Sequence, residues 1–313
     1  MKKLFISMLA IAALASCAKE EVIVADQGEL IGFNSFVENS TRAEKAYDPS
    51  YNATSLTAFN VWGTVGTVAI YTGNEVTGKV GNPDGGEQCI WKCNDVKQYW
   101  IKDAVYKFAA VAGVDKTKVA TGDDKLPSKV TIDASTAAVD VIYAKNYGAN
   151  DNGIIGQASN NAPVNFNFEH LLSKVKFTVN NGSTSATGYS FVVKDIVVKG
   201  SKIGTVVLAD RTWESKGAAA NYNVDSITVA AADAKEECAQ ELLLIPGQFE
   251  ITYKVDILCN GTPIATHTSS TNTVTIAGGN AYNFNINVAV GEEITFSVTQ
   301  EPTWANGGST TLI

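Results

Sequence analysis

The fold is decided by a stretch near the end of the chain, Tyr282-Asn283-Phe284-Asn285-Ile286-Asn287-Val288-Ala289-Val290. Large apolar residues alternate here with asparagines and one alanine. Successive side chains of an extended chain point to opposite faces, so this pattern places the apolar residues together on one side. It predicts a half-buried strand with one apolar and one wet face.

Short segments of the same kind recur through the chain, separated by turn residues. Asn181-Gly182 and Asn260-Gly261 are turn sequences typical of hairpins, and residues 169–173 are expected to form one helical turn. The predicted strands are 31–37, 57–62, 65–71, 98–100, 105–111, 139–144, 164–168, 175–179, 191–198, 204–208, 239–245, 249–258 and 294–298. Many short strands with almost no helical periodicity indicate an all-β chain of β-sandwich domains.

The first seventeen residues predict export. Lys2 and Lys3 precede an apolar stretch, residues 4–14, that is too short to span a bilayer. Small residues and then Cys17 close the segment, which resembles a bacterial lipobox with a lipidated cysteine. The expected location is the outer membrane and cell surface, with a lipid anchor that is at least transient. An ordinary secretory signal with a chance cysteine is the alternative.

Composition excludes several classes of function. The 313-residue chain has a formal net charge of -8 and two histidines, so nucleic acid is not an expected partner. No nucleophile–base pair, metal-ligand cluster or dinucleotide motif is visible, so no enzyme, metal or cofactor is expected. His170, which lies between apolar residues, is interpreted as a structural, hydrogen-bonded histidine.

Four cysteines remain after Cys17, and disulfides are permitted outside the cytoplasm. Cys238 and Cys259 lie almost symmetrically about a turn at residues 246–248, so a hairpin there would bring them together. Cys89 and Cys93 would bond only if the chain turns between them. Free, buried thiols are the other interpretation.

Two segments suggest that the chemistry of this chain is strand pairing. The first carries Ile31, Phe33 and Val37. The second, near the end, carries Ile294, Phe296 and Val298 with similar spacing, so a groove that accepts one segment accepts the other. A cut between Arg42 and Ala43 would detach the first strand and vacate its groove. The plain alternative is two ordinary strands of one molecule.

The order of several motifs resembles the Bacteroidetes fimbrillin family, the type V pilins. They are the lipobox at Cys17, an I-x-F strand before Thr41-Arg42-Ala43, Tyr99-Trp100 before Tyr106-Lys107-Phe108-Ala109-Ala110, the segment 166–177 (FNFEHLLSKVKF), Leu243-Leu244-Ile245-Pro246, and Gly278-Gly279-Asn280-Ala281-Tyr282. The resemblance implies two transthyretin-like β-sandwich domains in tandem. It also implies cleavage by an Arg-specific protease and polymerisation by donor-strand exchange with other fimbrial subunits, in fibres that serve adhesion.

The expected organisation has four parts. They are a lipoprotein signal with its cysteine (1–17), a tether with the N-terminal strand (18–42), an N-terminal sandwich (43–160) and a C-terminal sandwich with a donor-strand tail (161–313). The expected function is a structural fimbrial subunit. The alternative is a non-polymerising surface lipoprotein that anchors a fimbria or binds glycans on aromatic platforms such as Trp91 and Trp100.

Overall fold

The computed structural model describes residues 29–37, 56–79, 90–93, 95–135, 139–147, 152–184, 188–230 and 232–302. Strands make up most of this part, and its only helix is the one-turn 3₁₀ helix η1, Lys116–Lys118. Among these residues, no helix is long and apolar enough to cross a membrane. The prediction of an all-β chain is confirmed.

The strands of the N-terminal half are β1 (Phe33–Val37), β2 (Ala58–Val65), β3 (Val68–Lys79), β4 (Ile90–Cys93), β5 (Val105–Ala112), β6 (Val119–Thr121), β7 (Pro127–Asp133), β8 (Ile142–Asn146), β9 (Ile154–Ile155) and β10 (Val164–His170). Those of the C-terminal half are β11 (Ser173–Asn181), β12 (Tyr189–Ser201), β13 (Ile203–Val207), β14 (Trp213–Lys216), β15 (Ala219–Val224), β16 (Ile227–Val229), β17 (Lys235–Glu237), β18 (Leu242–Leu244), β19 (Gly247–Cys259), β20 (Thr262–Thr268), β21 (Asn272–Ile276), β22 (Ala281–Val288) and β23 (Thr295–Gln300).

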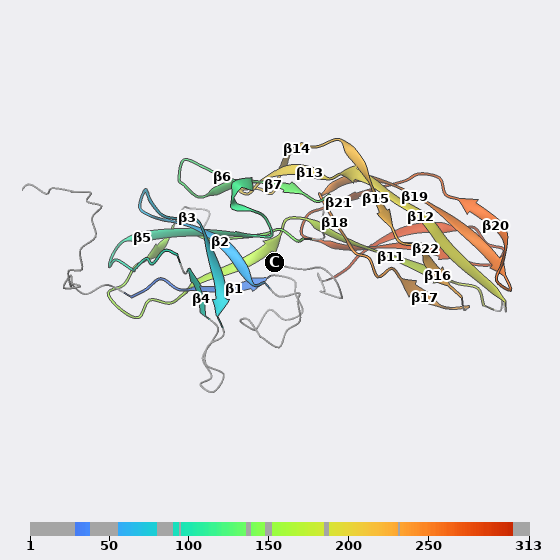
Figure 1. Ribbon diagram of the computed structural model, residues 1–313, viewed down its shortest axis with the longest axis horizontal. Helices are drawn as coiled ribbons and strands as arrows, with labels where there is room; N and C mark the ends of the chain where they lie inside the picture. The colour runs from blue at the N-terminus through green and yellow to red at the C-terminus, as the bar shows by residue number, and fades with distance from the viewer. Residues whose placement is uncertain are drawn as a thin grey trace, which may run out of the picture.

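The N-terminal half is a sheet that closes on itself. Its strand order is β2-β3-β4-β1-β10-β8-β5-β9, and β2 also pairs with β5. All of these strands except β9 therefore form a closed ring, and closure removes the sheet edges that would otherwise be exposed. In Figure 1 this ring is the blue-to-green half of an elongated molecule.

The core of the ring is largely aromatic. Its buried members include Phe33, Phe59, Trp91, Trp100, Tyr106, Phe108, Phe166 and Phe168. The alternating burial of β10, with every second residue buried, places Phe166 and Phe168 inside the ring. Aromatic side chains bury large apolar areas and dominate the energetics of such a core.

The C-terminal half is a sandwich of two sheets (Figure 1). One sheet has the order β17-β11-β22-β23 with β18 beside β11, and the other has the order β15-β12-β19-β20 with β16 and β21 beside β12 and β19. Their inner faces enclose a separate core that includes Phe177, Phe191, Phe249 and Phe284. The two separate cores agree with the prediction of two all-β units in tandem, the first a closed ring of strands and the second a sandwich.

A fourth sheet joins the halves. Its order is β14-β13-β7-β6, so β7 from the N-terminal half pairs with β13 from the C-terminal half. A third apolar cluster lies at this junction, with members from both halves such as Trp62, Tyr143, Leu172, Val206 and Ile245. The halves are therefore packed together and share a sheet.

Several local predictions need correction. Residues 169–173 form no helical turn, because β10 continues to His170 and β11 starts at Ser173. Asn181-Gly182 closes no hairpin, since β11 and β12 belong to different sheets. Residues 98–100 are not a strand, although Tyr99 forms an isolated bridge with Leu30.

Asn260-Gly261 does close a hairpin, between β19 and β20. Both of its residues have positive φ, 51° and 79°, as a type I′ turn requires. The division of the chain at residue 160 stays a prediction. Strand β10 lies beyond that point in sequence and yet pairs with β1 and β8 of the N-terminal ring.

Candidate functional site

The first strand lies inside the N-terminal ring. β1 runs parallel to β10, from the pair Phe33–Val164 to the pair Val37–Phe168, and Phe33 is opposite Trp91 of antiparallel β4. β1 thus has a neighbour on each side and is not an edge strand. Its removal would open the ring between β4 and β10.

The side chains of this segment are part of the core. Ile31 is 3% exposed and Phe33 is fully buried. The Phe33 ring stacks on Phe166 at a centroid distance of 5.8 Å and meets Tyr71 edge-on at 5.6 Å. Ile31 and Phe33 are therefore apolar teeth of the kind that the sequence predicts. For Val37 the structure describes only the backbone, which pairs in β1.

The last described strand occupies a different kind of position. β23 pairs only with β22, antiparallel from Tyr282–Gln300 to Asn287–Thr295, and forms the edge of its sheet. Phe296 is half-buried against Phe284 and Tyr253, with centroid distances of 5.6 and 6.3 Å, and Val298 is 38% exposed. The strand is therefore held less deeply than β1.

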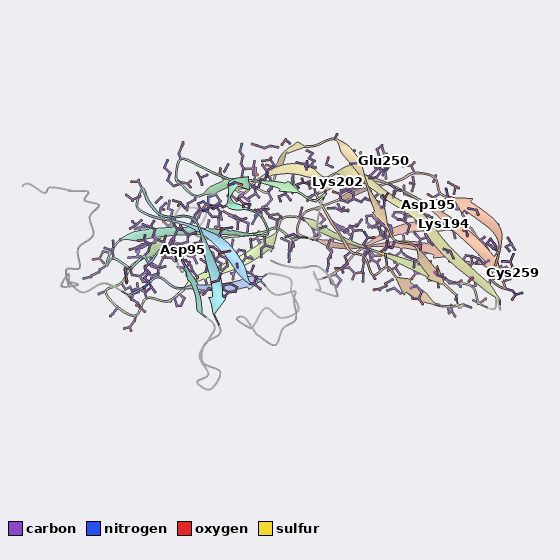
Figure 2. All side chains as sticks on the ribbon, viewed as in Figure 1. Asp95, Lys194, Asp195, Lys202, Glu250 and Cys259 are labelled. Carbon is purple, nitrogen blue, oxygen red and sulfur yellow. The ribbon has the colours of Figure 1, made fainter. Side chains whose placement is uncertain are left out.

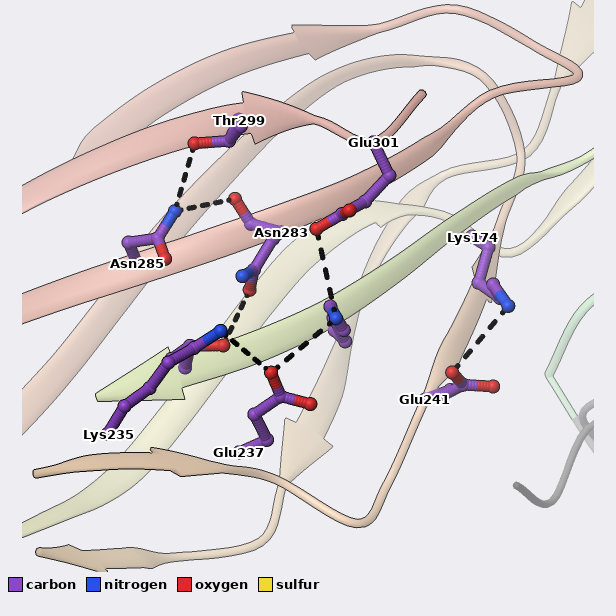
Figure 3. A network of polar contacts seen from close by, with 10 residues as sticks. Lys174, Lys235, Glu237, Glu241, Asn283, Asn285, Thr299 and Glu301 are labelled. Carbon is purple, nitrogen blue, oxygen red and sulfur yellow. Dashed lines mark hydrogen bonds and ion pairs between the residues drawn. The ribbon is translucent and has the colours of Figure 1, made fainter. Parts of the chain in front are cut away.

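The asparagines of β22 hold β23 through side-chain hydrogen bonds. Asn285 Nδ2 donates to Thr299 Oγ1 and Asn287 Nδ2 donates to Thr295 Oγ1, each at 3.2 Å. On the other side, Thr178 of β11 donates to Asn283 at 2.8 Å. Figure 3 shows the part of this ladder around Asn283, Asn285 and Thr299. The face of β22 that the sequence predicts to be in solvent is therefore occupied by side-chain hydrogen bonds. Asn283 on this face is only 5% exposed.

Ion pairs of Lys176 connect β11 to residues on both of its sides, next to these hydrogen bonds. Lys176 Nζ lies 3.6 Å from Glu237 and 3.7 Å from Glu301, just after β23 (Figure 3). The hydrogen bond from Lys235 is the main reason that the pKa of Glu237 lies below its ordinary value. Such partly exposed pairs are each worth about 1 kcal/mol or less. The ion pair of Lys176 with Glu301, at the end of β23, therefore stabilises this end only weakly.

The more deeply buried ion pair of this region lies closer to the junction. Lys174 and Glu241 approach to 3.6 Å with side chains 6% and 9% exposed. Burial lowers the pKa of Lys174, and the nearby Glu241 partly offsets this effect. The pair links β11 to the residue before β18 within the sandwich.

The predicted processing residues Cys17, Arg42 and Ala43 lie outside the described residues, as does Cys89. The predicted disulfide is not formed, because Cys238 and Cys259 are free thiols. The hairpin argument fails since β19 is a long strand that carries Cys259 to the far end of the C-terminal half (Figure 2). Cys238 instead follows β17 and pairs with Phe177 of the other sheet through its backbone. Cys93 is also a free thiol.

His170 has the structural role that the sequence indicates. Its Nδ1 is hydrogen-bonded to the Asp140 carboxylate, and both side chains are almost completely buried. The pair ties the end of β10 to the residues just before β8. Among the described residues, no group of three or more His, Cys, Asp or Glu side chains is placed to bind a metal ion.

The tryptophans proposed as glycan platforms are not available at the surface. Trp91 and Trp100 are 2% and 4% exposed, inside the ring. Sequence reasoning missed instead a cavity of about 290 Å³ beside the junction, lined by Arg211 and Trp213 among others. An arginine two residues before a tryptophan at a tight turn is the only signal of it in the sequence.

Two all-β units in tandem, with the first described strand enclosed in one and the last described strand on the edge of the other, make up the architecture of this chain. A fimbrial protein from Bacteroides vulgatus has this fold, with a TM-score of 0.61 at 13% identity over 87% of this chain and 99% of that chain. The chain itself belongs to the fimbrillin-like family, whose sequence model matches residues 41–302.

Other solved structures are similar over comparable lengths. A fimbrial assembly protein from Parabacteroides distasonis has a TM-score of 0.43 at 13% identity, covering 87% of this chain and 99% of that chain. The fimbrial anchor protein Mfa2 from Porphyromonas gingivalis has a TM-score of 0.36 at 13% identity, covering 88% and 98%. No curated protein matches the sequence.

Proposed function

We propose that this protein is a structural subunit of a cell-surface fimbria that polymerises by donor-strand exchange and serves adhesion. Membership of the fimbrillin-like family supports the class. The observation that carries the mechanism is the place of β1, which is the first described strand and yet lies between β4 and β10 of a closed ring. Loss of β1 would expose two strand edges and an open aromatic core, a site that invites strand addition.

The replacement strand in this proposal is the end of another copy. Ile294, Phe296 and Val298 repeat the apolar pattern of the first segment, and β23 is an edge strand that pairs with β22 alone. Detaching such a strand costs less than detaching a strand with a fully buried phenylalanine. Residues 303–313, which follow it, would extend the donor.

Arginine usage supports a single processing site. The chain has only two arginines, Arg42 and Arg211, among 24 basic residues. Arg211 lies in the tight β13–β14 turn, where its guanidinium pairs with Glu169 and stacks on Tyr143. A protease must bind its target in an extended form, so Arg211 is protected in the folded chain. Arg42 is then the site that separates β1 from the rest.

Addition of an Arg-specific endoprotease to the purified full chain tests the proposal. We expect one cut, after Arg42, followed by fibres in negative-stain electron microscopy and ladders in denaturing gels. Arg42→Ala should remain uncut and monomeric, while Arg211→Lys, the matched control at the other arginine, should behave as the wild type.

A second variant isolates the donor. A chain without residues 294–313 should still be cut and should stay monomeric. Fibres formed by this variant, or by uncut Arg42→Ala, would overturn the mechanism. N-terminal sequencing of surface-exposed protein from the source cell tests processing in place: a start at Ala43 supports it, and a blocked Cys17 supports a permanently lipidated protein.

A further inference from the structure

The cavity beside the junction is built by both halves of the molecule. Glu169 and Leu171 come from the end of β10 and the bend after it, and Arg211 and Trp213 from the β13–β14 hairpin. Pro246 and Gly278 complete the wall from the C-terminal sandwich. Pockets between structural units are common sites for small ligands, and about 290 Å³ is near the lower end of their usual size.

Arg211 is the one arginine in the part of the chain that the structure describes. Its φ is +63°, a left-handed conformation that is uncommon for a residue with a side chain. Asp210 stabilises the turn by accepting hydrogen bonds from the backbone N–H and the hydroxyl of Thr212, at 3.0 and 2.6 Å. The turn thus points a rare side chain at the pocket at some conformational cost.

The guanidinium of Arg211 is held in a fixed plane. Its centre lies 4.7 Å from the centroid of the Tyr143 ring, and Nη2 donates to the Glu169 carboxylate. The other terminal nitrogen, Nη1, is buried and has no hydrogen-bond partner. A lysine offers neither the planar stack nor the fork of donors. The guanidinium is therefore held in a fixed orientation, and its Nη1 donor has no acceptor in the protein.

Trp213 differs from the other tryptophans that the structure describes. Trp62, Trp91 and Trp100 are at most 4% exposed, whereas Trp213 is partly exposed and lines the pocket. Its ring lies over Gly204 of β13, where an added Cβ would approach Cε3 to 2.8 Å. Because residue 204 is a glycine, there is room for the indole of Trp213 next to it.

Apart from His170, the remaining side chains of the wall are apolar, from Leu171, Val206 and Pro246. An added Cβ on Gly278 would lie 3.0 Å from both the Leu171 carbonyl oxygen and the Pro246 ring. The pocket therefore combines an aromatic side chain, a firm apolar wall, a donor in Arg211 and an acceptor in Glu169. Arg211 and Glu169 carry opposite charges and neutralise each other, with side chains 34% and 51% exposed.

We propose that this pocket binds one neutral pyranose residue of a glycan. A sugar ring has an apolar face for the indole and hydroxyl groups that donate to Glu169 and accept from Arg211. The paired charges favour a neutral sugar over a carboxylate, which Glu169 would repel. No residue of β1 or β23 lines the pocket, so we expect it to bind the sugar in the uncut monomer, without assembly.

Saturation-transfer NMR on the uncut full chain tests the site. The probes are methyl glucopyranoside, methyl galactopyranoside, methyl mannopyranoside and N-acetylglucosamine, with glucuronate as the acidic comparator. We expect transfer to the ring protons of at least one neutral sugar. Trp213→Ala should weaken its binding by about tenfold, and Arg211→Lys by about fivefold, the equivalent of one hydrogen bond.

Two further variants keep the result interpretable. Gly204→Ala retains the indole and displaces it, so it should weaken the same sugar even if Trp213→Ala folds poorly. Arg42→Lys, at the arginine that does not line the pocket, should bind as the wild type. The proposal fails if no neutral sugar shows transfer, if Trp213→Ala and Arg211→Lys both bind undiminished, or if glucuronate binds more tightly. These outcomes leave the fimbrial proposal untouched.

Discussion

Replacing Phe33 by alanine measures how much of the N-terminal core depends on β1. The ring of Phe33 is fully buried and contacts those of Phe59, Tyr71, Phe108 and Phe166 at centroid distances of 5.6 to 6.4 Å. Truncating a buried phenylalanine costs about 3–5 kcal/mol. Since this side chain is enclosed by other rings that cannot easily collapse into the space, we expect a loss of about 4 kcal/mol.

Thermal and urea unfolding of the uncut chain, followed by circular dichroism and tyrosine fluorescence, give the measurement. At about 2–4 °C per kcal/mol, the transition of the N-terminal core should fall by about 10 °C. Phe296→Ala in β23 is the matched control. Its ring is half-buried and has two aromatic neighbours, so it should cost about 1–2 kcal/mol. A loss below about 1 kcal/mol for Phe33→Ala would refute the view that β1 completes the core.

Three further predictions concern single side chains. Burial raises the pKa of the Cys238 thiol, so iodoacetamide should label the more exposed Cys259 faster, as mass spectrometry of timed samples will show. The pKa of Glu237 is lowered, mainly by its hydrogen bond from Lys235, so its contribution to stability is present above about pH 4.3 and is lost as the pH falls through the folded-state pKa. Glu237→Gln should therefore reduce the fall of the urea midpoint on acidification, and an unchanged pH profile would contradict this. His170→Ala leaves a buried carboxylate without its donor and should cost about 3–5 kcal/mol in urea unfolding at neutral pH, whereas a cost near zero would show that water replaces the imidazole.

Period-two alternation was sufficient to predict the long strands. Around Tyr282 and Phe166 the inward residues are large and apolar, and burial follows the pattern. The structure departs from the sequence prediction where a strand is short or polar. β20 has no buried residue and β17 consists of Lys-Glu-Glu, so neither has an apolar period, and each forms because a neighbouring strand offers hydrogen bonds.

The candidate sites divide in the same way. The apolar teeth of Phe33 and Phe296 are local patterns, and the sequence shows them. The pocket is not a local pattern, because Glu169 and Arg211 meet only through the packing of β10 against the β13–β14 hairpin. The predicted pairing of Cys238 with Cys259 failed for a related reason, since a symmetric position in sequence does not place two thiols in the same sheet.

The parallel pairing of β1 with β10 also bears on how the molecule folds. A parallel pair needs a crossover, and here Phe33 meets Val164 only after the intervening strands β2 to β9 have been passed. Contacts between residues so distant in sequence form slowly, since the closure of a long loop precedes the gain. We therefore expect β1 to dock late, although it precedes the other described strands in the chain. If the proposed cut after Arg42 removes β1, the remaining chain could not regain this strand by refolding, and its folded state would depend on a segment that it no longer contains.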